Sequence, residues 1–151
     1  MNAAILGASG TVMQFVGDAV MAVFGAPVPL EHHADHAVTA ARAMHAAQHD
    51  VNLRWLASGL APFGLGIGVT TGEVAAAMLG SEERLEYTLV GDTVNLAQRI
   101  QQWAEPGQTV ISDTTHAALA QPVECQALEP ATVKGRNRPV VAFRIASEVG
   151  G

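Results

Sequence analysis

The sequence predicts an α+β sandwich in which helices cover one face of a mainly antiparallel sheet. Two observations carry this prediction: β-rich segments are arranged as hairpins, and segments between them have the three-and-four spacing of apolar residues that is typical of helices. The order is not the regular strand–helix–strand alternation of a parallel sheet. The chain of 151 residues is long enough for one core and contains no internal repeat, so a single domain over residues 1–151 is predicted.

The first part of the chain predicts a hairpin followed by a helix. Residues 11–25 are β-rich and are interrupted by Gly17-Asp18, which indicates two strands around a tight turn. Residues 31–57 carry small and apolar residues at helical spacing, most of them alanine. An alanine face predicts that another element packs close to this helix.

Glycines mark the next predicted strand. Residues 63–80 are predicted to form two strands around residues 70–73, and Gly64, Gly66 and Gly68 alternate within the first strand. Alternating residues of a strand point to the same face, so these glycines leave one face without side chains. Such a face indicates that another element or a ligand lies close to the backbone of the strand.

The second half of the chain alternates helices and strands. A helix is predicted over residues 91–104, a strand over 108–112 and a short helix over 113–120, with Asp113 as its N-cap. Residues 131–146 are predicted to form two strands around a Gly-Arg-Asn turn.

Composition excludes several classes of function. The net charge of −6 argues against a basic face that binds nucleic acid. No apolar run reaches the roughly 18 residues of a membrane span, and the start of the chain lacks the basic flank of a secretory signal. The single cysteine, Cys125, allows no intramolecular disulfide, which suits a reducing cytoplasm.

Two residues in turns are candidate ligands for a metal ion or a phosphate. Asp18 is explained equally well as a turn former and as a Mg²⁺ ligand, because hard cations bind carboxylate oxygens. Lys134 is the only lysine and precedes a glycine, so it is either a solvated side chain or part of a phosphate-binding loop. His32 and His36 have the spacing of helical metal ligands, but a solvated helix start explains them better.

The helix predicted over residues 91–104 places a carboxamide beside a guanidinium. Asn95 and Arg99 are four residues apart and therefore share one face, while Leu96 and Ile100 would hold the helix to the core. On spacing alone, a helix with one polar edge explains this pair better than a binding site does.

In combination these stretches resemble the catalytic domain of the class III nucleotidyl cyclases, the adenylyl and guanylyl cyclases, and in particular the bacterial adenylate cyclase type. The segment GDAVMAVFGAP is similar to the family's metal-binding hairpin, GIGVTTGEVAAAMLG to its central strand pair, YTLVGDTVNLAQRIQQWAEPGQTVIS to its most recognisable segment, and VKGRNRPVVAFRI to its closing hairpin. The resemblance runs from about residue 11 to about residue 146 and leaves residues 1–10 as a leader outside the family pattern. It implies a ferredoxin-like βαββαβ core with extra elements, and an enzyme that forms a cyclic nucleotide and pyrophosphate.

The resemblance also implies the roles of the site residues. Asn95 would orient the ribose, and Arg99 would stabilise the negative charge that grows at the α-phosphate while the ribose 3′-OH attacks it in line. Lys134 would bind the β- and γ-phosphates, and Asp18 would be the second of two metal-binding aspartates for two Mg²⁺ or Mn²⁺ ions. In the family the site forms between two domains that pack head to tail, so a homodimer is expected.

Two further positions bear on the choice of purine in this family. Gln14 stands where adenylyl members usually have Lys and guanylyl members Glu, and its amide can both donate and accept hydrogen bonds. Thr88 stands where many adenylyl members have Asp or Thr. ATP is therefore the expected substrate, with weak discrimination against GTP.

One part of the family pattern is missing from the sequence. The family's first metal-binding Asp lies on a strand upstream of the hairpin, whereas Asp18 is the first acidic residue of this chain. A truncated chain, a degenerate domain or a strand supplied by a partner would each explain this, and a missing central strand predicts open ladder edges in the sheet. We expect an N-terminally incomplete domain with little or no cyclase activity.

Two alternative functions follow from the same residues. A non-catalytic module that binds nucleotide or dimerises would explain the missing Asp, although the presence of Asn95, Arg99 and Lys134 together favours an enzyme. The related diguanylate cyclases find no support, because no Gly-Gly-Asp/Glu-Glu-Phe signature is present.

Overall fold

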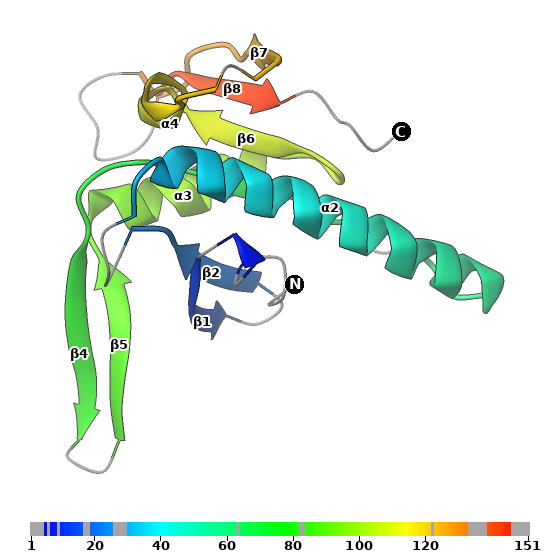
Figure 1. Cartoon of the computed structure of the whole chain (residues 1–151), viewed down its shortest axis with the longest axis horizontal. Helices are drawn as coiled ribbons and strands as arrows, with labels where there is room; N and C mark the ends of the chain where they lie inside the picture. The colour runs from blue at the N-terminus through cyan, green and yellow to red at the C-terminus, as the bar shows by residue number, and fades with distance from the viewer. Residues whose placement is uncertain are drawn as a thin grey trace.

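The computed structural model describes residues 5, 7–8, 10–16, 19–25, 30–62, 64–81, 84–121, 123–132 and 139–145, and only the backbone of the strand residues 12–16, 75–81 and 84–89. Figure 1 shows the elements in order along the chain: β1 (Thr11–Val16), β2 (Ala19–Val23), α2 (His33–Ala57), β3 (Ile67–Val69), β4 (Ala75–Ser81), β5 (Arg84–Val90), α3 (Asp92–Trp103), β6 (Thr109–Ser112), α4 (Asp113–Ala118), β7 (Cys125–Ala127) and β8 (Ala142–Ile145).

A four-stranded sheet in the order β3-β6-β8-β7 forms the centre of the molecule. β3 and β6 run parallel, whereas β8 runs antiparallel to both β6 and β7. The mixture of helices with this mainly antiparallel sheet confirms the predicted α+β class. Every residue of β6 is buried, so this strand is the centre of the core.

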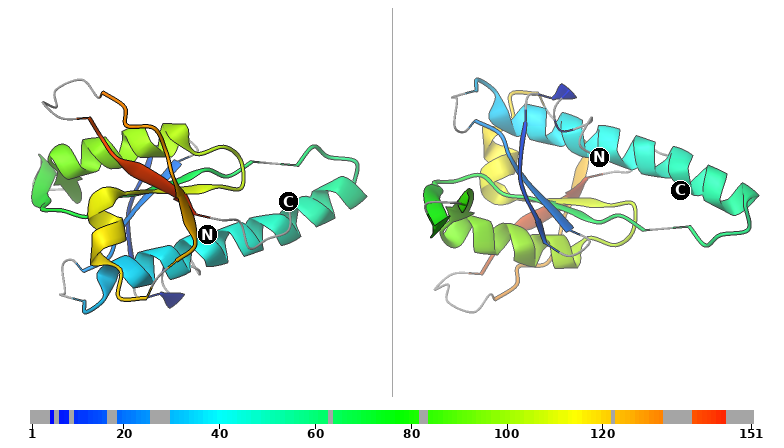
Figure 2. Two further views of the ribbon diagram at one scale, coloured as in Figure 1. Left: turned by 90° about the horizontal axis from the view of Figure 1, so that it is seen from above. Right: turned by 90° about the horizontal axis from the view of Figure 1, so that it is seen from below.

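The long helices lie on opposite faces of this sheet. Val110 and Ile111 are neighbours in β6 and therefore point to opposite faces. Val110 packs with Leu96 and Ile100 of α3, whereas Ile111 packs with Val38 of α2. Figure 2 shows the strands between the two helices. The helices were expected on one face, but β6 is apolar on both faces, and each face needs its own cover.

The glycine face of β3 lies directly against the backbone of α3. A Cβ atom on Gly68 would collide with the amide N of Gln101 and would lie 2.8 Å from the carbonyl O of Ala97. One on Gly66 would lie 3.0 Å from the carbonyl O of Ala104, which is tight but less severe. The expectation that another element lies close to these glycines is confirmed, and that element is α3.

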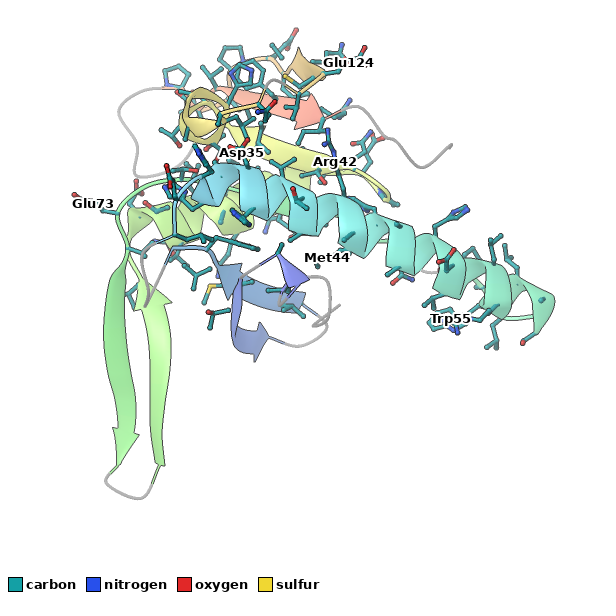
Figure 3. The ribbon with its side chains drawn as sticks, in the orientation of Figure 1. Asp35, Arg42, Met44, Trp55, Glu73 and Glu124 are labelled. Atoms are coloured by element: carbon teal, nitrogen blue, oxygen red, sulfur yellow. The ribbon has the colours of Figure 1, made fainter. Side chains whose placement is uncertain are left out.

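The first half of α2 is the part that packs, and its alanines explain how closely it does so. Its buried residues all lie between positions 34 and 41: Ala34, Ala37, Val38, Ala40 and Ala41. The second half extends beyond the sheet, and its exposed apolar side chains include Leu53 and Trp55 (Figure 3). None of the helices in the described part of the chain is both long enough and apolar enough to span a bilayer.

Two polar contacts fix the start of α2. The carboxylate of Asp35 accepts hydrogen bonds from the backbone N–H groups of Ala120 and Gln121, at 2.8 and 2.9 Å. The bond from Ala120 in particular lowers the pKa of Asp35. The Nδ1 atom of His36 donates to the carbonyl O of Ala8 at 3.0 Å. Asp35 and His36 therefore connect α2 to segments far away in the sequence.

Two hairpins stand outside the four-stranded sheet. β1 and β2 pair with each other and lie below the helices, on the side away from β7 and β8 (Figure 1). β4 and β5 form a long antiparallel hairpin that projects from the body. Among the described residues β3 pairs only with β6, so the sheet has an open edge at β3, and the β1–β2 hairpin has open edges of its own.

Several predicted elements are confirmed, and others pair differently. The hairpin over residues 11–25 and the helices over 31–57 and 91–104 are present. The two strands within residues 63–80 do not pair with each other, because β3 joins β6 and β4 joins β5, a strand that the pattern did not predict.

Two details near the C-terminus also differ from expectation. The N-cap of α4 is Ser112 rather than Asp113, because the Ser112 hydroxyl accepts the N–H of Thr115. The strands predicted in residues 131–146 are β8 and a single antiparallel bridge between Ala131 and Val140. The turn predicted between them lies outside the described residues.

Gly68→Ala should destabilise the fold by about 3 kcal/mol, because the new methyl group meets helix backbone that cannot rotate away. Gly7→Ala is the matched control, since a Cβ there meets nothing within 4 Å. Urea unfolding of the two variants measures the difference. Equal stability of both variants would contradict the close approach of α3 to β3.

The stability of the chain should fall in mild acid because of His45. Its Nε2 atom is hydrogen-bonded to Oγ1 of Thr109 at 3.0 Å, and burial lowers the pKa of His45 below its ordinary value of 6.5. The unfolded chain therefore binds the proton more readily, so this stability is complete above about pH 6.5 and is lost as the pH falls through the lower folded-state pKa. The unfolding free energy of His45→Gln should depend less on pH between about pH 7 and pH 5. Replacement of the exposed His49 on the same helix is the control and should keep the parent slope.

Candidate functional site

The candidate site is the exposed side of α3. Leu96 and Ile100 are buried against the sheet, at 7% and 0% exposure, and hold one side of the helix down. Asn95 and Arg99 precede these two anchors by one residue each and are exposed. Within the described part of the chain, neither side chain is engaged in a hydrogen bond or an ion pair. The pair therefore presents N–H donors to solvent from a rigid helix.

Helix α3 begins directly after Gly91, at the base of the projecting β4–β5 hairpin. Gly91, which follows β5 directly, has a φ of +133° that a residue with a side chain rarely adopts. No side chain caps this helix at the Gly91 position. The first backbone hydrogen bond of the helix runs from the N–H of Asn95 to the carbonyl of Gly91, at 3.3 Å. Asn95 thus lies at the end of the first turn.

Threonine hydroxyls connect this first turn to the link between β3 and β4. Oγ1 of Thr93 donates to the carbonyl O of Glu73 at 2.8 Å, and Oγ1 of Thr70 donates to the carbonyl O of Thr93 at 3.0 Å. A Cβ on Gly72 would lie 2.6 Å from the Thr93 hydroxyl, so a glycine is required there. Figure 3 shows Glu73 at this end of α3 with its side chain directed outward. No local sequence pattern marks these threonines, since their partners are backbone atoms about 20 residues away.

The other predicted site residues are placed less completely. Gln14 lies in β1 opposite Met21, and Thr88 lies in β5 opposite Ala77, but their side chains are not among those described. Asp18 and Lys134 lie outside the described residues. The roles of all six predicted site residues therefore stay predictions, and the structure brings Asn95 and Arg99 together on one exposed helix face.

A metal ion would need ligands from beyond the described side chains. Among those that are described, no group of three or more His, Cys, Asp or Glu could hold a metal ion. His32, Asp35 and His36 line a surface pocket at the start of α2, but the Asp35 carboxylate is already bound by two backbone N–H groups. Asp18 has the hard carboxylate oxygens that suit Mg²⁺ or Mn²⁺.

Comparison with known proteins identifies the relatives of this chain. The family model of the adenylate and guanylate cyclase catalytic domain matches residues 8–146. The chain is 35% identical over 142 residues to adenylate cyclase 1 of Rhizobium meliloti, an alignment that covers 93% of this chain and 21% of that protein. The chain therefore spans about a fifth of the length of that relative.

Solved structures agree with the sequence match. The guanylyl cyclase Cya2 superimposes with a TM-score of 0.90 at 36% identity, over 97% of this chain and 74% of that chain. The adenylyl cyclase CyaB from P. aeruginosa superimposes with a TM-score of 0.89 at 30% identity, over 97% of this chain and 76% of that chain. On the match of the family model to residues 8–146, this chain belongs to the adenylate and guanylate cyclase catalytic domain family.

Proposed function

We propose that this chain is the nucleotide cyclase domain of an enzyme that converts ATP to 3′,5′-cyclic AMP and pyrophosphate. The observation that carries the proposal is the pair of unengaged donors, Asn95 and Arg99, on the exposed side of α3. The helix is held by its buried side chains and by the backbone contact with Gly68, so these donors need little ordering when a ligand binds.

The chemistry assigned to the pair is electrostatic. The 3′-OH of the ribose attacks the α-phosphorus in line, the new O–P bond forms as the bond to pyrophosphate breaks, and negative charge grows on the α-phosphate oxygens. The Arg99 guanidinium stabilises that charge, and the Asn95 amide orients the ribose. Lys134 binds the β- and γ-phosphates as a point charge.

Metal ions would complete this site. Asp18 would hold Mg²⁺ or Mn²⁺ together with oxygens of the triphosphate; the bound ions neutralise phosphate charge and lower the cost of deprotonating the 3′-OH. Because no carboxylate precedes Asp18 in the sequence, the upstream aspartate of a two-ion site is not provided by residues 1–17. We therefore propose that this polypeptide binds its metal ions weakly and turns over slowly or not at all.

The site would be shared between two copies of the chain in a head-to-tail homodimer, with metal ions from one copy and Asn95 and Arg99 from the other. The relatives named above include a protein named as an adenylate cyclase and one named as a guanylyl cyclase. Thr88 favours adenine, whereas Gln14 can serve either purine.

One observation favours a second candidate function. Residues 1–17 contain no carboxylate, and a module derived from a cyclase that binds nucleotide or dimerises without turnover would need none there. Triphosphate binding is common to a slow enzyme and a nucleotide-binding module, whereas product formation separates them.

Arg99→Ala should weaken binding of Mn²⁺–ATP about ten- to hundredfold, because a charge-assisted hydrogen bond contributes about 1.5–3 kcal/mol. Isothermal titration calorimetry of the purified chain measures the change. Arg54→Ala is the matched control, since Arg54 is exposed near the far end of α2, and it should bind as the parent does. Equal affinity of the two variants, together with equal turnover, would remove Arg99 from the site.

The parent chain should form little or no cyclic nucleotide when it is incubated with Mn²⁺ and either ATP or GTP. Mass spectrometry of the products measures both the yield and the purine preference. Ready, Mn²⁺-dependent formation of cyclic AMP would contradict the proposed low activity and would exclude the non-catalytic module. Formation of cyclic GMP in excess would contradict the preference for adenine.

A further inference from the structure

We propose that Thr93 is a positioning residue that sets the orientation of Asn95, by fastening the first turn of α3 to the link between β3 and β4. This inference rests on the proposed function, because it assigns Asn95 a ligand to meet. The Thr93 side chain does not touch the ligand itself: it is hydrogen-bonded to the backbone of Glu73 and affects the ligand through the position of Asn95.

Thr93 both donates a hydrogen bond to the link between β3 and β4 and accepts one from it. Its hydroxyl donates to the carbonyl O of Glu73 at 2.8 Å, and its own carbonyl accepts the hydroxyl of Thr70 at 3.0 Å. Two hydrogen bonds on one residue restrict both its position and its rotation about the helix axis. Gly72 allows this approach, since any side chain there would collide with the Thr93 hydroxyl.

The link between β3 and β4, to which Thr93 is hydrogen-bonded, is also held by contacts with α4. Thr71 follows Thr70 and points to the opposite face, where its hydroxyl is hydrogen-bonded to that of Thr115 at 2.8 Å. Thr115 is fully buried and is also hydrogen-bonded to the hydroxyl of Ser112 at 3.1 Å. The link is thus held from α3 on one face and from α4 on the other, which makes it a firm base.

The first turn of α3 is held by fewer contacts than the rest of the helix, so a hydrogen bond to a fixed segment matters most there. The N-cap residue Gly91 has no side chain that could cap the helix, and the helix begins there at the foot of a projecting hairpin. The second contact that fixes α3 lies further on, where Gly68 touches the backbone of Ala97 and Gln101. Without the Thr93 hydroxyl, this first turn would lose its side-chain hydrogen bond to the link between β3 and β4.

This arrangement separates Asn95 from Arg99. Asn95 lies between the Thr93 contact and the Gly68 contact, whereas Arg99 lies within the segment that Gly68 already holds. Loss of the Thr93 hydroxyl should therefore misplace the Asn95 amide and leave the Arg99 guanidinium in place. A displacement of about 1 Å is enough to remove most of the benefit of an oriented group.

Thr93→Val removes the hydroxyl at nearly constant shape, and Thr93→Ser restores it. Thr39→Val is the matched control, because Thr39 is an exposed threonine of α2. The first measurement is amide hydrogen exchange of Asn95 in the ligand-free chain. We expect exchange about tenfold faster in Thr93→Val, and near the parent rate in Thr93→Ser and Thr39→Val. An unchanged rate in Thr93→Val would overturn the fastening role of Thr93.

The second measurement is a double-mutant cycle on the affinity for Mn²⁺–ATP. Thr93→Val should weaken binding severalfold in the parent and in the Arg99→Ala background, and should have no further effect in the Asn95→Ala background. Equal loss in all three backgrounds would mean that Thr93 acts on the fold alone, which would overturn the positioning role, as would unchanged affinity in Thr93→Val. If neither Asn95→Ala nor Arg99→Ala alters affinity, the proposed function fails and the positioning role fails with it, while the exchange rates still decide whether Thr93 fastens the helix.

Discussion

The contact between Gly68 and the backbone of α3 is the constraint on which the rest of the structure depends. Side chains normally separate a helix from the sheet that it covers, but here the methylene of a glycine faces the peptide groups of Ala97 and Gln101. So close an approach sets both the depth and the direction of the helix. With Leu96 and Ile100 buried on one side, Asn95 and Arg99 are left exposed on the other.

Hydrogen bonds of threonine and serine hydroxyls fix the position of α3 further. Thr70 and Thr71 are consecutive and point to opposite faces of the sheet, so one reaches α3 and the other reaches α4. Buried hydroxyls are costly unless they are paired, and Thr115 and Ser112 are each paired within this network. This network of hydrogen bonds joins α3, α4 and the link between β3 and β4. It therefore fixes the link from which the β4–β5 hairpin projects.

The open edges of the sheet and the exposed donors of α3 have a common implication for assembly. β3 and the β1–β2 hairpin present unpaired ladder edges among the described residues, and natural proteins seldom leave such edges free. The donors of α3 likewise have no acceptor within the described chain. Both features would be satisfied by pairing with a second copy in the proposed homodimer.

The sequence by itself determined several of the elements and the family: the first hairpin, both long helices and the Asn95–Arg99 pair all follow from local periodicity, turn residues and motifs. It also indicated that something lies against Gly68, because alternation along a strand is a local property. Only the tertiary structure decided that α2 and α3 take opposite faces, that β3 pairs with β6, and that Thr93 meets Glu73. These outcomes depend on which distant segments bury each other, and no pattern within a short window contains that information.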